Sequence, residues 1–246
     1  FYVNLPIGVA AWVFGMVFLD AHRAESAGRL DVAGFLLSAA GLGLVMYGIS
    51  EGPFKSWGQP LIVGTIAAGA LLLVAMVVVE LRSSAPLIDI RLFRNGLFRN
   101  ANVVMLLGSI AFLGVLFIAA LFFQDGLGMS ALRSGLSIFP EAIGVMLGAQ
   151  VVTRFLYPTL GPRRVMFGGL LILAVSLSLM SLIDTTTQLW WMRVLMFFTG
   201  YGMAHVFTSA QAAGFATISG PDTARASTVF NALRQLGGAV GVAALS

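Results

Sequence analysis

The sequence predicts an all-α membrane protein, a polytopic bundle of eight transmembrane helices. Of its 246 residues, 59% are hydrophobic and only 10% are charged, whereas about 25% of the residues of soluble domains are charged. These charges are too few to cover a water-facing surface. Eight apolar runs account for most of the chain, and each can cross about 30 Å of hydrocarbon as a helix. Transmembrane strands are excluded because such strands alternate polar and apolar residues.

The eight apolar runs are separated by short polar connections. We expect helices over residues 3–20, 32–50, 60–81, 101–123, 135–156, 165–183, 189–212 and from 225 to the end. Residues that break or start helices, such as Gly52-Pro53 and Gly161-Pro162, stand in most of the connections. The longest connection, residues 82–100, alternates apolar and charged residues in part, and we expect it to lie along the membrane surface.

Most of the lysines and arginines lie in or next to every second connection, namely those that follow the first, third, fifth and seventh apolar runs. Because loops rich in Lys and Arg stay in the cytoplasm, we assign these connections to the cytoplasmic side. Trp57, Trp190 and Trp191 then lie at the outer interface, where an aromatic belt is typical. The regular alternation supports the count of eight membrane spans.

Composition excludes several kinds of chemistry. The chain has no cysteine and two histidines, which removes thiolate nucleophiles and zinc fingers and leaves little for a metal site. Signatures of metal hydrolases, serine hydrolases and nucleotide-binding loops are absent, so we expect no enzyme, no catalytic residue, no metal and no cofactor. The net charge of +4 is assigned to loops that face anionic lipid rather than to nucleic-acid binding.

The helix predicted over residues 189–212 carries the clearest candidates for function, because ionisable groups inside a membrane mark pathways or buried pairs. One stripe of this helix contains Arg193, Phe197, Gly200, Ala204, Thr208 and Gln211, with Tyr201 and His205 beside it. We expect the stripe to line a path for substrate or protons. Alternatively, Arg193 extends to the lipid headgroups, and His205 makes a hydrogen bond to a neighbouring helix.

The last predicted helix has a polar and small face that contains Asn231 and Arg234. We expect this face to point away from lipid and to contribute to the same path. Gly237 and Gly241 lie four residues apart, a spacing that lets two membrane helices approach closely. Helix packing is therefore an alternative role for this part of the chain.

Glu141 is predicted to lie in the outer third of the helix over residues 135–156, directly after Pro140. A carboxyl group at that depth suits a residue that binds and releases protons. The alternative is an ion pair with Arg133 at the outer mouth or with Arg193.

Four stretches in chain order resemble the fourteen-span drug:proton antiporters of the major facilitator superfamily, the EmrB/QacA-type subfamily. They are FYVNLPIG at residues 1–8; PLIDIRLFRN at 86–95; Gln124, Gly128, Ser130, Gly135, Leu136 and Pro140; and RAS at 225–227 followed by Asn231 and RQLGGAVGVA at 234–243. The resemblance implies a partial major facilitator fold, with the eight helices as the sixth to thirteenth of fourteen. Residues 1–20 would then be the last helix of the N-terminal half, residues 21–100 two linker helices and an amphipathic cytoplasmic loop, and residues 101–246 most of the C-terminal half.

A cytoplasmic gating motif of that superfamily resembles the loop that contains Gly161, Arg163 and Arg164. Pro158 and Thr159 stand where the motif has Asp and Arg, so the charge relay of the motif is not expected here. The two arginines are expected to anchor the loop to lipid phosphates or helix ends.

The resemblance implies a secondary active transporter that exports drugs or other small amphipathic compounds by alternating access, coupled to protons. Its partners would be a small-molecule substrate, protons, membrane lipids and the missing N-terminal half, because the chain begins and ends inside apolar runs and is expected to be an internal fragment. We expect it in the bacterial inner membrane. The alternative is a channel or a non-transporting membrane scaffold, although no ring of charges or repeated filter segment is visible.

Overall fold

The computed structural model describes residues 4–18, 31–82, 90–183 and 188–245. Every regular element in these ranges is helical, which confirms the predicted all-α class for the described part of the chain. The chain divides into two compact units, residues 1–30 and 31–246. The described helix of the first unit is α1 (Asn4–Phe18), which is apolar along its whole length.

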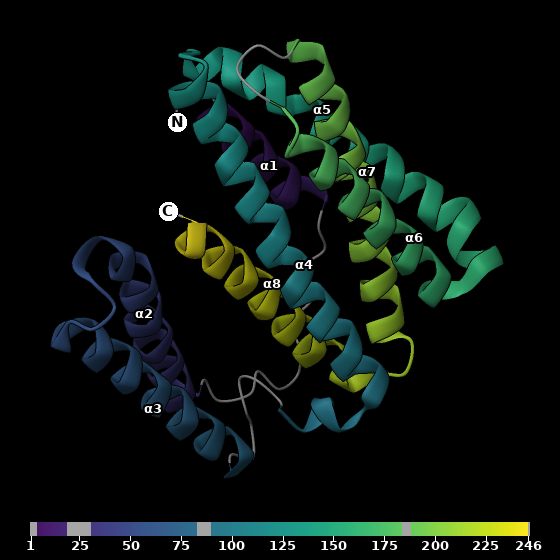
Figure 1. The fold of residues 1–246 in the computed structure, drawn as a ribbon. Helices are drawn as coiled ribbons and strands as arrows, with labels where there is room; N and C mark the ends of the chain where they lie inside the picture. The colour runs from purple at the N-terminus through teal and green to yellow at the C-terminus, as the bar shows by residue number, and fades with distance from the viewer. Residues whose placement is uncertain (1–3, 19–30, 83–89, 184–187, 246) are drawn as a thin grey trace. The chain divides into compact units, whose positions relative to one another are not determined.

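The second unit contains seven long helices within its described residues (Figure 1). They are α2 (Val32–Lys55), α3 (Pro60–Arg82), α4 (Gly96–Leu121), α5 (Ala131–Val151), α6 (Tyr157–Met180), α7 (Leu189–Phe215) and α8 (Thr223–Leu245). Each predicted apolar run therefore overlaps one long helix. Short 3₁₀ helices precede α4 and α8, and single π-helical turns follow α4 and α5.

Several helices begin earlier than the apolar runs predicted. α4 begins at Gly96 because the side chain of Asn95 accepts hydrogen bonds from the backbone N–H groups of Leu97 and Phe98 at 3.0 and 3.2 Å, and so caps the helix. The loop expected at residues 157–164 is also wrong: this stretch is helical, with a single break at Gly161, where φ is 72°. Only glycine adopts that conformation at little cost.

Length and apolar composition identify four segments of the described chain that could cross a membrane. They are Val32–Lys55, Pro60–Arg82, Gly96–Gly126 and Ala131–Met180, the last of which contains both α5 and α6. Large apolar side chains on α2, α3, α5 and α6 are exposed, as expected for helices that face lipid rather than water.

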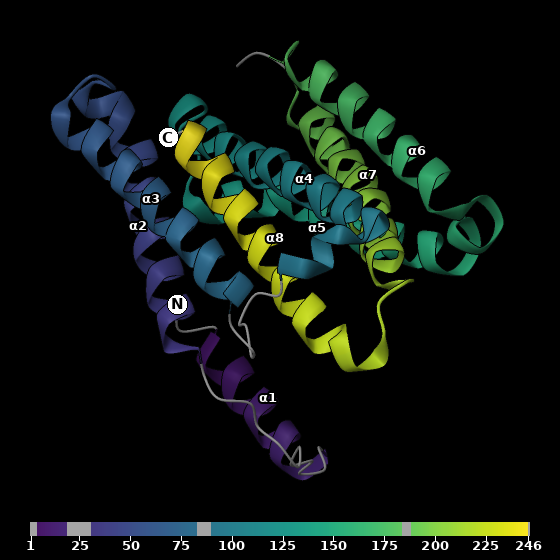
Figure 2. The same cartoon turned by 90° about the horizontal axis from the view of Figure 1, so that it is seen from below.

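α7 is the central helix of the bundle formed by α4 to α8. It packs against α4, α5 and α6, and α4 also packs against α8 (Figures 1 and 2). More residues are buried on α7 than on any other described helix. One apolar cluster joins Ala119 and Phe123 to Met192 and Met196, and a second joins the start of α4 to the start of α8.

Candidate functional site

The middle of the predicted path-lining stripe on α7 is a helix packing surface. A Cβ atom on Gly200 would overlap the carbonyl oxygen of Glu141 on α5, and a Cβ atom on Gly148 would lie 2.8 Å from the Cβ atom of Ala204. α5 and α7 therefore meet backbone to backbone at this point. Gly200 and Ala204, in the middle of the stripe, therefore serve close helix packing, as small residues on membrane helices often do.

The two ends of that stripe, Arg193 and Gln211, are exposed. The Nη2 atom of Arg193 donates a hydrogen bond to the Oγ atom of Ser137 on α5, with a separation of 3.4 Å. Ser137 is fully buried and donates in turn to the carbonyl oxygen of Arg133 at 2.9 Å. Arg193 is thus linked to α5 and does not merely extend toward headgroups.

Glu141 lies one helical turn after Ser137 on α5, and 7% of its surface is exposed. Among the described residues, its carboxyl group makes no ion pair, so the pairing with Arg133 or Arg193 is not found. The structure thus places a buried carboxyl group beside the crossing point of α5 and α7.

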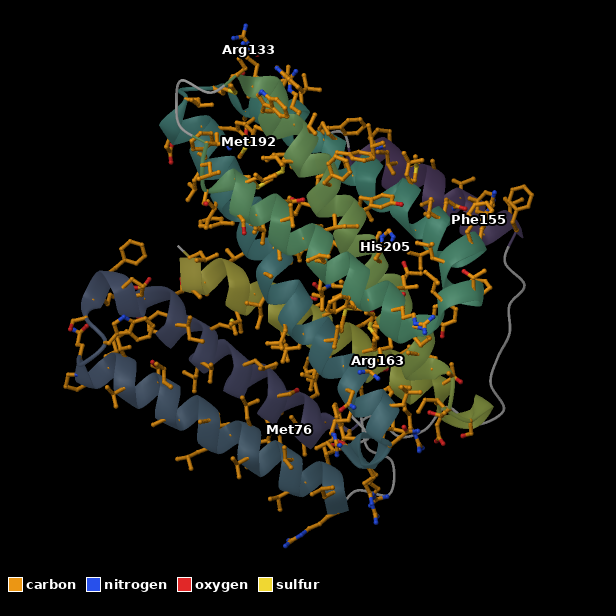
Figure 3. The ribbon with its side chains drawn as sticks, turned by 45° about the vertical axis from the view of Figure 1, so that its right-hand side comes forward. Met76, Arg133, Phe155, Arg163, Met192 and His205 are labelled. Carbon is orange, nitrogen blue, oxygen red and sulfur yellow. The ribbon has the colours of Figure 1, made fainter. Side chains whose placement is uncertain are left out.

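His205 is buried near the middle of α7 (Figure 3). Its Nδ1 atom lies 2.8 Å from the carbonyl oxygen of Tyr201, one turn earlier on the same helix. Because a carbonyl group can only accept, Nδ1 carries the proton. The expected bond to a neighbouring helix is therefore replaced by a bond within α7, while Gly169 of α6 provides the room for the Cβ atom of His205.

α8 packs on α4 through its glycines and carries exposed polar residues beside that contact. Gly237 and Gly241 face the backbone of α4 at Leu106 and Ile110, where a Cβ atom would overlap it, so the close packing predicted from their spacing is confirmed. Asn231 and Arg234 are exposed, although Arg234 lies three and seven residues before these glycines and therefore on the same side of α8. The Nδ2 atom of Asn231 donates to the carbonyl oxygen of Ser227 at 3.0 Å.

A hollow of about 230 Å³ lies between α4, α7 and α8. It is lined by Ser109, Phe112, Leu113, Phe207, Arg234 and Gln235. The rings of Phe112 and Phe207 meet edge to face, with 5.8 Å between their centroids. The hollow therefore combines an aromatic wall, a guanidinium group, an amide and a hydroxyl group.

Sequence reasoning identified Arg234 as a candidate but missed Ser109, Phe112 and Phe207. A single serine in an apolar helix is common, and phenylalanines in a membrane chain are explained by lipid contact and packing. Their meeting depends on how α4 packs beside α7 and α8, which no local pattern encodes. The structure does not bring Glu141 or His205 into this hollow.

The stretch that resembles a gating motif forms the first turns of α6. Arg163, which is labelled in Figure 3, and Arg164 are both exposed. The hydroxyl group of Thr159 donates to the carbonyl oxygen of Phe155 at 2.7 Å, within its own helix. In the described part of the chain, no group of three His, Cys, Asp or Glu residues is placed to hold a metal ion.

A sequence model described as Major Facilitator Superfamily matches residues 1–242. The chain is 29% identical over 251 residues to the tetracenomycin C resistance and export protein of Streptomyces glaucescens, covering 100% of the chain and 46% of that protein. It is 28% identical over 248 residues to the puromycin resistance protein pur8 of Streptomyces alboniger, covering 100% of the chain and 49% of that protein. A multidrug resistance protein B homolog of Mycobacterium tuberculosis is 28% identical over 251 residues, again covering 100% of the chain and 46% of that protein. The chain thus spans about half the length of the curated relatives it matches.

Proposed function

The chain belongs to the major facilitator superfamily, and we propose that the protein of which it forms part exports drugs or other small amphipathic compounds in exchange for protons. The observation that carries the proposal is the hollow between α4, α7 and α8, where a guanidinium group, an amide and a hydroxyl group meet two aromatic rings. The names of the relatives as resistance and export proteins support the same substrate class. Members of this superfamily are transporters, so no enzymatic role is assigned.

We propose that the seven long helices α2 to α8 are membrane spans and that α1 is the described part of an eighth. α7 and α8 are long enough, with 27 and 23 residues. They carry polar residues because α7 buries several between its neighbours and α8 presents Asn231 and Arg234, which we assign to the substrate path. A helix that faces a cavity does not need to be apolar all round. The basic connections then place the start of α4 and the end of α7 in the cytoplasm, and we propose the bacterial inner membrane as the location.

The fourteen-span subtype is part of the proposal. In that arrangement α1 ends the N-terminal half, α2 and α3 are linker helices within residues 21–100, and α4 to α8 form most of the C-terminal half. The uncovered polar face of α8, with Asn231 and Arg234, would then oppose the N-terminal half across the substrate path. Gly161, Arg163 and Arg164 would form a cytoplasmic hinge with a basic patch for lipid phosphates.

The test is transport by the full-length protein in inverted membrane vesicles that maintain a pH gradient. Addition of an exported compound should collapse part of the gradient, because each exported molecule is exchanged for protons. Vesicles without the protein provide the control. Substrate flux that is indifferent to the pH gradient would favour the channel alternative, and neither flux nor proton movement across a broad panel of compounds would contradict an exporter.

A further inference from the structure

We propose that the hollow between α4, α7 and α8 binds planar aromatic compounds that carry an anionic group, such as a carboxylate. This inference rests on the proposed transport function and narrows its substrate class. The hollow joins side chains from three helices, Ser109 and Phe112 of α4, Phe207 of α7, and Arg234 and Gln235 of α8. Arg234 and Ser109 would bind the anion, and the two phenylalanines would contact the ring.

Ser109 provides the first argument, because its hydroxyl group can still form a hydrogen bond. The residue is 1% exposed, and its Oγ atom has no hydrogen-bond partner within the described structure. Serine and threonine in an apolar helix normally donate to the carbonyl group one turn earlier, as Ser137 and Thr199 do here. The side-chain oxygens of Asn102 and Ser209 also lack a partner, but neither residue lines the hollow.

Arg234 provides the second argument, because it is a cation in the middle of a helix that we assign to the membrane. It lies eleven residues from each end of α8, which is about three helical turns, so its charge is far from either headgroup region. Across the described residues, Arg225 pairs with Asp222 at the start of α8, whereas Arg234 forms no ion pair. A cation at that depth requires a counter-charge, and a bound carboxylate can supply one through two parallel N–H···O bonds.

The aromatic wall provides the third argument and limits the shape of the ligand. Phe112 and Phe207 meet edge to face at an interplanar angle of 82°. Such a pair offers a ring face and a ring edge, and a flat ring can stack on the one or meet the other. The hollow of about 230 Å³ is smaller than a typical drug pocket of roughly 300–1,000 Å³. It therefore accommodates the charged group and its attached rings rather than a whole large drug.

The amide of Gln235 completes the polar side of the hollow, since it can donate to a second oxygen of the ligand. A permanently cationic compound of the same shape should bind most weakly, because the charge of Arg234 repels it. Neutral compounds lose the charge-assisted bonds but retain the aromatic contacts. The expected order of affinity is therefore anion, then neutral compound, then cation.

The experiment compares three anthracene derivatives of one shape: the carboxylate, its neutral amide and the trimethylammonium compound. Binding to the purified full-length protein is measured by fluorescence titration, and export is measured in inverted vesicles. Arg234→Gln should weaken binding of the carboxylate about tenfold or more, as expected for loss of a charge-assisted pair, and should leave binding of the amide nearly unchanged. Ser109→Ala should weaken binding of the carboxylate several-fold.

Two matched variants control for general effects of substitution. Arg99→Gln removes an exposed arginine of α4 outside the hollow, and Ser134→Ala removes a buried serine of α5. Both should bind the carboxylate like the unaltered protein, and thermal unfolding of all variants verifies that they are folded. Arg234→Lys retains the charge without the fork of two donors and should recover part of the affinity.

The outcomes distinguish the proposed anion site from the proposed export function. If the unaltered protein exports the cationic or neutral compound as well as the carboxylate, and Arg234→Gln changes nothing, the anion site is wrong while the exporter stands. If none of the compounds moves and none collapses the pH gradient, but the carboxylate binds and Arg234→Gln weakens its binding, the anion site stands and the exporter is wrong. If the carboxylate does not bind the unaltered protein, the anion site is wrong.

Discussion

Within the described residues, the carboxyl group of Glu141 is our candidate for a group that binds and releases protons. It is buried on α5, beside the crossing with α7, and it forms no ion pair in the described structure. Glu141→Gln preserves the size of the side chain but removes its ability to bind and release a proton. We expect the variant to lose proton-driven export, so that substrate no longer collapses the pH gradient. It should retain exchange of substrate across the membrane, which counterflow measures.

Glu51→Gln is the control for that measurement. Glu51 lies near the end of α2 and pairs with Lys55 at 2.8 Å, with its side chain about one-third exposed. An exposed pair of this kind contributes little, so the control should retain coupling. Coupling that survives Glu141→Gln as well would remove Glu141 from the proton path.

Gly161 is the residue whose backbone conformation most restricts substitution. Its φ of 72° lies in the left-handed region, and no neighbouring atom lies within 4 Å of the position that a Cβ atom would occupy, so a substitution there acts through the backbone alone. With ψ at 168°, this conformation is essentially restricted to glycine, and we expect Gly161→Ala to destabilise the fold by about 1–3 kcal/mol. Thermal unfolding of the purified protein measures the change.

Gly168 provides a matched control on the same helix. It also has open space at the Cβ position, but its φ is not positive, so alanine should be tolerated or slightly stabilising there. Equal unfolding temperatures for the two alanine variants would show that the break at Gly161 does not restrict the chain.

At the scale of helices, the crossing of α5 and α7 is the contact that we expect to be least tolerant of added bulk. A Cβ atom on Gly200 would overlap the carbonyl oxygen of Glu141, which cannot move aside as a flexible side chain could. Gly200→Ala should therefore lower the free energy of unfolding by about 1–3 kcal/mol, the range for overpacking. Gly135→Ala on α5, where nothing lies within 4 Å, should have a much smaller effect in the same unfolding assay.

The same helices show how far the sequence predicts the fold. The positions of the helices could be predicted because apolar runs of this length have few alternatives in a membrane. The beginning of α4 could not, since Asn95 starts it ahead of the apolar run by a local cap. The packing face of α7 could not be predicted either. Gly200 and Ala204 are compatible both with a substrate path and with a helix contact, and only the position of α5 decides between the two.

The candidate site divides in the same way. Arg234 stands out in any apolar sequence because charge in a membrane is costly. Ser109 becomes a candidate only because it has no hydrogen-bond partner in the described structure. Phe112 becomes one only because its ring contacts that of Phe207. Both facts are properties of the packed bundle, so reasoning along a single helix could not find them.

At the scale of the whole molecule, the number of membrane crossings can be tested with cysteine labelling. The chain has no cysteine, so, once any cysteine in the rest of the full-length protein is replaced by serine, each introduced cysteine is the single target of a maleimide reagent that does not cross membranes. Eight spans place Gly58, between α2 and α3, and Gln188, before α7, outside the cell. They place Asn100, ahead of the apolar run of α4, and Gly220, between α7 and α8, in the cytoplasm.

Gly58→Cys and Gln188→Cys should therefore react in intact cells, and Asn100→Cys and Gly220→Cys should react only after the membrane is opened. All four positions are exposed in the structure, so a lack of reaction reports the membrane rather than burial. The pair at residues 188 and 220 tests α7 directly, because a helix that crosses must have its ends on opposite sides. If both react from the same side, α7 does not span, and the hollow that its Phe207 helps to line would not belong to a path across the membrane.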